Sequence, residues 1–155
     1  MSLTELETAL DLIEINADTA RFNGRTSDEL VSSAEAAIGI TLPPTYRIFL
    51  LRLGCGSIYG EEFYGIPKRG LNSPSVPNAI WLTLNERKAA DLPESLILVA
   101  DNGLGGWYAI DTSRKNPDGD SPVVDWFSNE QPTEIVAEDF GAFLLQRLRQ
   151  ALDRQ

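Results

Sequence analysis

The chain has 155 residues, a length that corresponds to one domain or at most two small ones. Its apolar fraction of 43% and charged fraction of 23% are ordinary for a globular protein. The formal net charge is -10, from 13 basic and 23 acidic residues. Such a surface repels nucleic-acid phosphates and attracts a basic protein partner, although acidity can also serve solubility alone.

The sequence contains one cysteine, Cys55, and no histidine. A single cysteine excludes an intrachain disulfide and is typical of a reducing compartment. The absence of histidine removes the Ser-His-Asp triad, the Cys-His pair and most zinc sites. The start of the chain has no basic region or long apolar run, so we expect no signal peptide, no membrane span and a cytoplasmic protein.

Apolar side chains recur at helical spacing over 3–13, 30–38, 46–53 and 140–148, and 79–92 is typical of a short helix that ends before Pro93. The second helix has a capping box at Thr26 and Glu29 and a stop at Gly39. Pro43 and Pro44 are compatible only with the start of the third helix.

Strands are predicted between these helices, at Leu96–Ala100, Trp107–Thr112 and Val123–Phe127, with a short hairpin around Gly60 and Glu61. Strands that follow one another through short turns favour an antiparallel sheet. We therefore predict an α+β fold, with a mostly antiparallel sheet of about four to six strands packed against N-terminal and C-terminal helices. The Leu96–Ala100 run is apolar throughout and favours a central strand.

Alternation along the last two strands predicts one open sheet face. Asp111 and Asp125 are expected to point outward, which places Trp107 and Phe127 beside them. Aromatic and acidic side chains together form a good contact surface. The alternative is that helices cover this face and the aromatic residues belong to the core.

The glycine-rich stretch Gly103–Gly106 follows a strand and raises the possibility of a phosphate-binding loop. A dinucleotide fingerprint would need a third glycine where Tyr108 stands and a helix afterwards, but another strand follows. Asp101 and Asp111 would also repel a phosphate. The pattern therefore favours a β-hairpin turn.

Other chemistry is weakly indicated. Glu61 with Glu62, or Asp101 with Asp111, could form the carboxylate pair of a glycoside hydrolase, but chance pairs are expected among 23 acids. The stretch "NPDGDSP" lacks the spacing of a calcium loop. We expect no catalytic residues, no metal and no cofactor.

Three segments together resemble one known family. They are "AEAAIGITLPPTYRIFLLRLGCG", "LILVADNGLGGWYAIDT", and "PVVDWF" followed by an acidic start to a terminal helix. This ordered set resembles the SUKH superfamily, in its branch related to the yeast cell-wall assembly regulator Knr/Smi, from about Leu30 to Leu148. One departure is the step Gly54-Cys55-Gly56, where the family usually has Asn-Gly-Gly.

The resemblance implies an α+β domain spanning 1–155, with a core of about 27–153 preceded by an N-terminal helix. It also implies a non-enzymatic immunity protein that neutralises a toxin, often a nuclease, by stoichiometric binding. The alternatives are a regulatory interaction module and a carboxylate-based hydrolase. The oligomeric state stays open. Our candidate partner-binding residues are Tyr59, Glu61, Glu62, Tyr64, Trp107, Asp111, Asp125 and Phe127.

Overall fold

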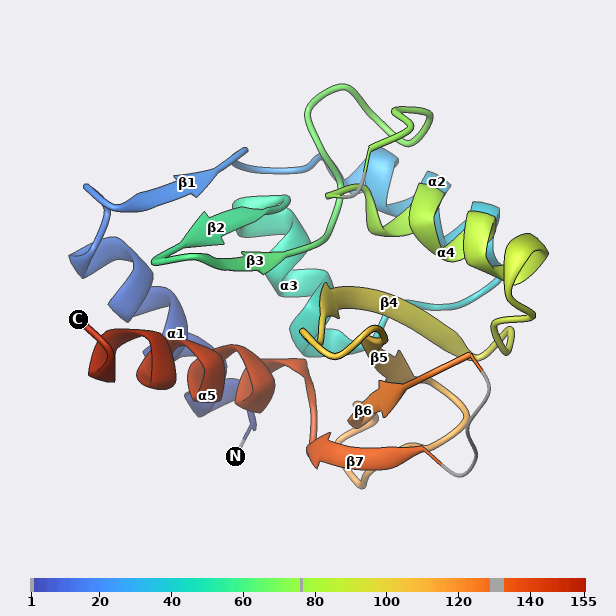
Figure 1. Cartoon of the computed structure of the whole chain (residues 1–155). Helices are drawn as coiled ribbons and strands as arrows, with labels where there is room; N and C mark the ends of the chain where they lie inside the picture. The colour runs from blue at the N-terminus through green and yellow to red at the C-terminus, as the bar shows by residue number, and fades with distance from the viewer. Residues whose placement is uncertain (1, 76, 129–132) are drawn as a thin grey trace.

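A computed structural model of the chain describes residues 2–75, 77–128 and 133–155, which form an α+β fold, as predicted (Figure 1). The helices are α1 (Ser2–Ile15), α2 (Asp28–Ile38), α3 (Pro44–Leu53), α4 (Ala79–Ala89) and α5 (Phe140–Asp153). The strands are β1 (Ala20–Phe22), β2 (Gly56–Ile58), β3 (Glu61–Phe63), β4 (Leu96–Asp101), β5 (Trp107–Asp111), β6 (Val123–Trp126) and β7 (Glu134–Ala137).

The first half of the chain contributes a small antiparallel sheet of order β1-β2-β3. Tyr59 and Gly60 both have positive φ, 48° and 83°, which is the geometry of a two-residue type I′ hairpin turn. The predicted hairpin is therefore confirmed. The sequence did not indicate β1, because three residues are too few for a periodic pattern.

The second half contributes a separate antiparallel sheet of order β4-β5-β6-β7. The three strands predicted here are confirmed within one residue at each end. The expected single sheet is instead two sheets, and β7 was not predicted. Its burial pattern is weak, since Glu134 and Ile135 are both exposed and only Val136 and Ala137 approach the core.

β4 is an edge strand of its sheet, which corrects the central position predicted from its apolar sequence. A register shift lies between Leu98 and Ala100, and there the Val99 carbonyl accepts a hydrogen bond from the Tyr64 backbone at 2.8 Å. The hydroxyl of Thr83, on α4, accepts from the Leu98 backbone at 3.1 Å. β4 is apolar because neighbouring elements cover its free edge and both of its faces.

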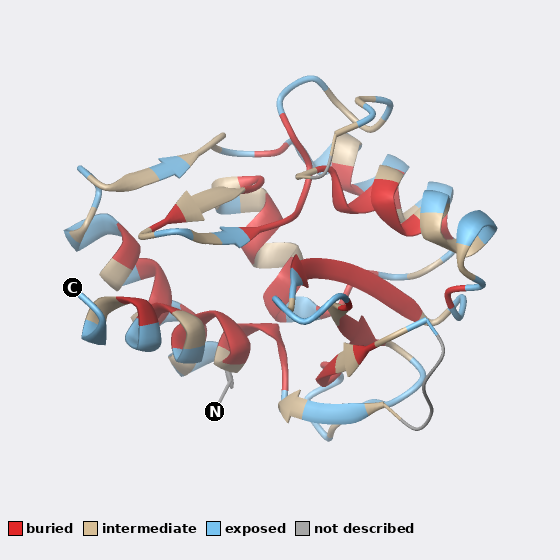
Figure 2. Cartoon of the chain, viewed as in Figure 1, coloured by how far each residue is buried: buried red, intermediate tan, exposed pale blue. Residues whose placement is uncertain are grey.

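Two hydrophobic clusters lie on opposite faces of the second sheet. Figure 2 shows β4, which lies between them, as buried along almost its whole length. The larger cluster joins the first sheet to α1, α2, α3 and α5 around aromatic rings that meet edge-on or at a tilt. The Tyr46 and Phe140 centroids are 4.8 Å apart, and those of Phe49 and Phe140 are 5.0 Å apart. The smaller cluster packs α4 against Leu98 and Trp126.

The predicted open face carrying Trp107, Asp111, Asp125 and Phe127 is wrong. α4 covers the face to which Trp107 contributes, and Asp111 is buried. Asp125 pairs with Tyr108 across the strands and therefore lies on the opposite face from Trp107, which pairs with Trp126. The alternation was assigned with the two strands out of register by one residue, and such a slip exchanges the faces.

The sequence predicted the C-terminal end of α2 correctly but placed its N-cap one residue too early. Gly39 adopts φ 71° and ends the helix as predicted. The N-cap is Ser27, whose hydroxyl accepts from the Leu30 backbone, and not Thr26, which is buried one residue earlier.

Cys55 is buried, as expected. Burial is the main cause that raises the pKa of its thiol to about 11, and the charge of Glu62 contributes less.

The first turn of α1 brings Glu5 close to Glu138 and Asp139. Burial, a hydrogen bond with Glu138 and the charges of both acids raise the Glu5 pKa above its ordinary 4.5. The associated stability is therefore fully present below that ordinary value and is lost as pH rises through the folded-state pKa. We expect Glu5→Gln to raise Tm by about 1 °C near neutral pH.

Thermal unfolding of both proteins near pH 7 and near pH 4 measures this effect. The advantage of Glu5→Gln should shrink at the lower pH, because wild-type Glu5 is protonated there. The Glu7→Gln variant, changed at an exposed position of the same helix, is the control for charge alone. An equal gain in both variants would contradict the role of Glu138 and Asp139.

Candidate functional site

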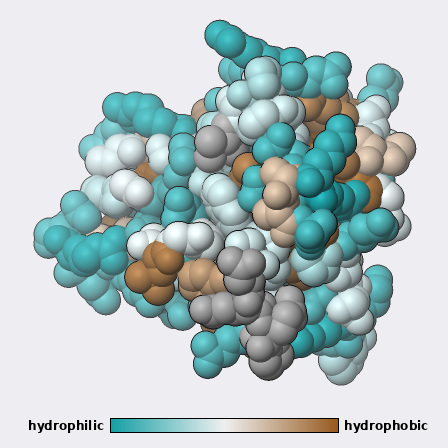
Figure 3. Space-filling view, turned by 45° about the vertical axis from the view of Figure 1, so that its right-hand side comes forward, coloured by the Kyte–Doolittle hydropathy of each residue, from teal (hydrophilic) through white to brown (hydrophobic). Residues whose placement is uncertain are grey.

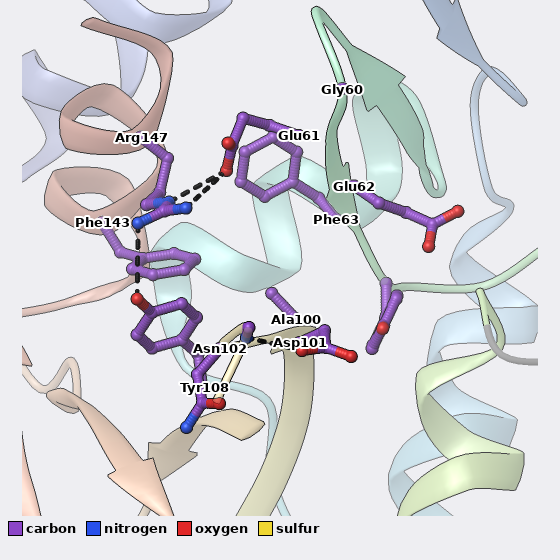
Figure 4. Close-up of a pocket in the computed structure, with 12 residues that line it drawn as sticks. Gly60, Glu61, Glu62, Phe63, Ala100, Asp101, Asn102, Tyr108, Phe143 and Arg147 are labelled. Atoms are coloured by element: carbon purple, nitrogen blue, oxygen red, sulfur yellow. Dashed lines mark hydrogen bonds and ion pairs between the residues drawn. The ribbon is translucent and has the colours of Figure 1, made fainter. Parts of the chain in front are cut away.

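A cleft of about 560 Å³ opens where β3 and β4 diverge beyond the Tyr64–Val99 hydrogen bond (Figure 4). Ligand pockets are commonly of this size. Four segments line it: the β2–β3 hairpin, the end of β4 with its following turn, β5 and α5. The lining residues that carry its chemistry are Glu61, Glu62, Tyr64, Asp101, Tyr108 and Arg147.

The α5 side of the cleft is a closed network of charges (Figure 4). Arg147 donates from Nε and Nη2 to Glu61 Oε1 at 3.0 and 2.8 Å, and from Nη1 to the Tyr108 hydroxyl at 3.3 Å. Arg154 donates to Glu61 Oε2 at 2.9 Å. The Glu61 side chain is only 15% exposed and has arginines on both oxygens, so it is neutralised within the protein.

The other side of the cleft carries carboxylates without a basic partner. Figure 4 shows the Glu62 side chain on the opposite side of β3 from Glu61. Neither Glu62 nor Asp101 forms an ion pair among the described residues. The charges of both carboxylates act on Tyr64. Burial raises the pKa of the Tyr64 hydroxyl far above its usual value, and the charges of Glu62 and Asp101 raise it further. Its hydroxyl therefore stays protonated at neutral pH.

The lip of the cleft is the β4–β5 turn, which contains the glycine-rich stretch. The Asn102 side-chain oxygen accepts from the backbones of Leu104 and Gly106 at 2.9 and 3.0 Å. Asp101 Oδ1 accepts from the Gly103 backbone at 2.6 Å. The hairpin interpretation is confirmed, and Gly103 of this turn lies at the rim of the cleft.

The glycines of this turn have different roles. Gly103 and Gly105 have positive φ and open space around them, whereas a Cβ on Gly106 would overlap the Trp126 carbonyl oxygen and approach Phe127 Cδ1 to 2.7 Å. We expect Gly106→Ala to cost about 2 kcal/mol of unfolding free energy through overpacking. Gly103→Ala and Gly105→Ala should each cost about 1 kcal/mol for the left-handed conformation.

Urea denaturation of the three variants gives the order directly. Gly103→Ala and Gly105→Ala are the matched controls, because they make the same chemical change in the same turn without a clash. If Gly106→Ala were the mildest of the three, close packing against β6 would not be the reason for that glycine.

The cleft brings together three of the eight candidate partner-binding residues: Glu61, Glu62 and Tyr64. Trp107 lies behind Tyr64, with ring centroids 6.1 Å apart. Asp125 reaches the lip only through Asn102, whose amide donates to it at 3.3 Å.

The remaining three candidates lie outside the cleft lining, as Trp107 and Asp125 also do. The Tyr59 hydroxyl donates to Asn16 at 3.0 Å and joins the β2–β3 turn to the end of α1. Phe127 packs beside Gly106. Asp111 is buried at the far end of β5, where it accepts from Ser113 and pairs with Arg114 at 3.2 Å.

The structure does not bring together either of the two carboxylate pairs that the sequence offered as candidates for a hydrolase. Glu61 and Glu62 leave β3 on opposite sides (Figure 4), and Glu61 is held by two arginines. Asp101 and Asp111 lie at opposite ends of the β4–β5 pairing, where Asp101 faces Trp107 and Asp111 faces Leu96. The described ranges contain no group of three or more Cys, Asp or Glu residues arranged to hold a metal ion.

Sequence reasoning missed the contribution of Tyr108 and Arg147. Phe143 was assigned to the core, which is correct, but its ring also contacts Tyr108 with centroids 5.0 Å apart at the cleft. A signal was present: Arg147 follows Phe143 by one helical turn, so a cation lies at the edge of an apolar helix face. A charge in that position needs a buried or half-buried partner.

The family comparison agrees with this architecture. The family model for SUKH_6, described as SMI1-KNR4 cell-wall, matches residues 28–144, more than half of the chain. The chain belongs to the SUKH family. The match begins at α2 and ends within α5, so it includes both β3 and β4 and most of the elements that line the cleft.

Membership in the SUKH family supports a protein-binding role in broad terms. The domain extent of 1–155 stays a prediction, since the match leaves α1 and the end of α5 outside. Among the helices of the described residues, none has the length and hydropathy needed to cross a membrane. Most of the surface in Figure 3 is hydrophilic, with hydrophobic residues in separate patches.

Proposed function

We propose that this SUKH protein is a cytoplasmic immunity protein that neutralises a basic toxin domain by stoichiometric binding. The observation that carries the proposal is the cleft, which combines unpaired carboxylates with aromatic side chains in a family associated with protein binding. Aromatic anchors in a concave site are typical of strong protein interfaces.

The charge of the chain supports a basic partner. With a net charge of -10, the protein would attract a cationic domain over distances beyond direct contact and accelerate association. A nuclease that grips phosphates presents such a cationic surface. An acidic protein that occupies it would block substrate access without any chemistry of its own.

Co-expression with the toxin domain encoded beside this gene tests the proposal. We expect the protein to rescue growth and to form a complex with one copy of each chain. A complex of this kind should dissociate faster and associate more slowly as salt is raised.

The matched control is an unrelated acidic protein of similar size and charge, which should not rescue growth. Failure of both rescue and complex formation would reject the pairing with that toxin. A complex whose association rate does not depend on salt would reject the electrostatic part alone.

A regulatory interaction module is the second candidate, favoured by the match to the SMI1-KNR4 cell-wall model. Such a protein would bind a cellular partner in the absence of any toxin. Deletion of the gene distinguishes the two: a growth or cell-wall defect without toxin exposure favours the regulatory module, and a defect seen only on exposure favours the immunity protein.

A further inference from the structure

We infer that the cleft receives an arginine side chain of the partner, with its guanidinium between the carboxylates of Glu62 and Asp101. This inference rests on the proposed function, because it assigns the chemistry of the same binding site.

The charge balance of the cleft is the first argument. Glu61, Glu62 and Asp101 line it, and Arg147 is the cation that faces them. Arg147 is fully engaged with Glu61, which a second arginine also binds. The two remaining carboxylates are exposed and have no ion pair in the described chain, so the cleft has a surplus of negative charge. A cationic group of the partner would neutralise this negative charge.

The second argument is a hydroxyl donor at the same place. Tyr64 is 2% exposed, yet it lines the cleft. Its phenol oxygen interacts with the Asp101 backbone and keeps its proton, but no acceptor for that proton is found in the residues the structure describes. The hydroxyl itself reaches the surface of the cleft, where a bound ligand would bury it, and a buried hydroxyl normally has an acceptor. A carboxylate drawn toward a bound cation would supply one.

The apolar part of the lining gives the third argument. Phe63, Ala100 and Phe143 contribute to the cleft, and because they are almost completely buried they offer only a small apolar area to a ligand. An arginine or lysine has an aliphatic stem that packs on such surfaces while its charged end reaches polar groups. An anion or a wholly apolar group would match only part of this lining.

Arginine fits better than lysine because of its shape. The guanidinium is a planar fork with five donors, so it can bind two carboxylates at once and also stack on an aromatic ring. The protein already uses this arrangement on the other wall, where Arg147 binds Glu61 and lies 5.3 Å from the centre of the Tyr108 ring.

The test uses the full chain and the blocked tripeptide acetyl-Gly-Arg-Gly-amide, followed by amide chemical shifts in NMR. Isolated side chains bind weakly, so a dissociation constant on the order of 1 mM is expected. Shifts should concentrate at Glu62, Tyr64, Asp101 and Gly103. The same peptide with citrulline, which keeps the shape without the charge, should produce no saturable shifts, and the lysine peptide should bind about threefold more weakly.

The decisive variant is Glu62→Gln with Asp101→Asn. Asparagine retains the side-chain oxygen that accepts from the Gly103 backbone, so the turn is preserved while both charges are removed. Binding of the arginine peptide should weaken at least about fivefold. The control variant is Asp18→Asn with Glu94→Gln, which removes two exposed acids outside the cleft and changes the net charge equally.

Three results would overturn the inference: equal shifts with the citrulline peptide, shifts outside the cleft, or undiminished binding by the Glu62/Asp101 variant. The proposed function fails separately. If both variants rescued growth against the toxin equally well, the function would stand and this inference would fall. If the peptide bound in the cleft but no toxin were neutralised, the recognition chemistry would stand and the immunity function would fall.

Discussion

Gly65→Ala is expected to lower the free energy of unfolding by about 4 kcal/mol or more, a large share of the total stability of a typical domain. An added Cβ would overlap the carbonyl oxygen of Gly54 and approach Leu50 Cδ2 to 2.7 Å. The obstacle is backbone, which cannot rotate away as a side chain can. The cost is therefore steric overlap at a point with no room for relaxation.

The location of Gly65 explains why the structure cannot shift to relieve that overlap. Its backbone donates to Pro77 and accepts from Ala79, each at 2.8 Å, and the next residue donates to Gly54 at 3.1 Å. The chain here joins the first sheet, the end of α3 and the start of α4 at a single crossing. Moving it outward would break all of these hydrogen bonds.

Gly70→Ala is the matched control. Gly70 has φ 90°, and no atom lies within 4 Å of the position that an alanine methyl group would occupy, so alanine there should cost only about 1 kcal/mol of conformational strain. Circular dichroism and urea denaturation of both variants measure the difference. A Gly65→Ala protein within about 1 kcal/mol of wild type would show that the crossing is loose.

The elements that the sequence predicted well are those with a repeating pattern and a clear end. α3 begins after Pro43, and α2 ends at Gly39 in the left-handed conformation. α5 carries Phe140, Phe143, Leu144 and Leu148 inward, as its spacing required. In each case, local conformational preference and burial favour the same structure.

The sequence failed where burial depends on a distant neighbour. Leu96–Ala100 was expected in the middle of a sheet, but it is an edge strand covered by Thr83 and Tyr64 from other elements. Trp107 was expected on an open face that α4 in fact covers. No local pattern shows which helix lies over which face, because that is determined by the path of the chain between them.

The candidate site could be predicted only in part, because local sequence identifies residues on one segment but not the distant segments that pack against it. Glu61, Glu62 and Tyr64 lie on one short segment, so they reach the cleft together. Their opposite-wall neighbours come from segments about 40 and 80 residues later in the chain, which only the tertiary fold brings close. The glycine-rich turn was identified correctly as a hairpin, but its position at the lip of a cavity required the structure.

Asp120→Ala is expected to cost about 3 kcal/mol of unfolding free energy, the second largest effect. The stretch "NPDGDSP" offered weak grounds for a metal loop, yet Asp120 is buried and caps a helix far away in sequence. Its Oδ2 accepts from the Thr45 backbone in the first turn of α3 at 3.1 Å, and its Oδ1 accepts from Ser121 at 3.0 Å. Pro43, the residue before α3, supplies no side-chain cap.

The effect should extend to a second helix. Thr45 uses its hydroxyl to accept from the Gly141 backbone at the start of α5, at 3.1 Å, so Asp120 holds in place a residue that caps its neighbour. Removing the carboxylate leaves a buried amide of α3 without a partner and removes a negative charge from its positive end. The loss is therefore larger than for an exposed cap.

Asp120→Asn and Asp118→Ala sharpen the measurement. Asparagine retains one accepting oxygen and loses the charge, so about half of the loss should return. Asp118 is exposed in the same loop, and its replacement should change the stability by less than about 0.5 kcal/mol. Urea denaturation of the three variants measures the change in unfolding free energy. Hydrogen exchange at the first turns of α3 and α5 shows where the structure is weakened. The contrary result is that Asp120→Ala destabilises the protein no more than Asp118→Ala does. In that case the hydrogen bond between Asp120 and α3 would not contribute to stability, and amide exchange in the first turns of α3 and α5 would not be faster than in wild type.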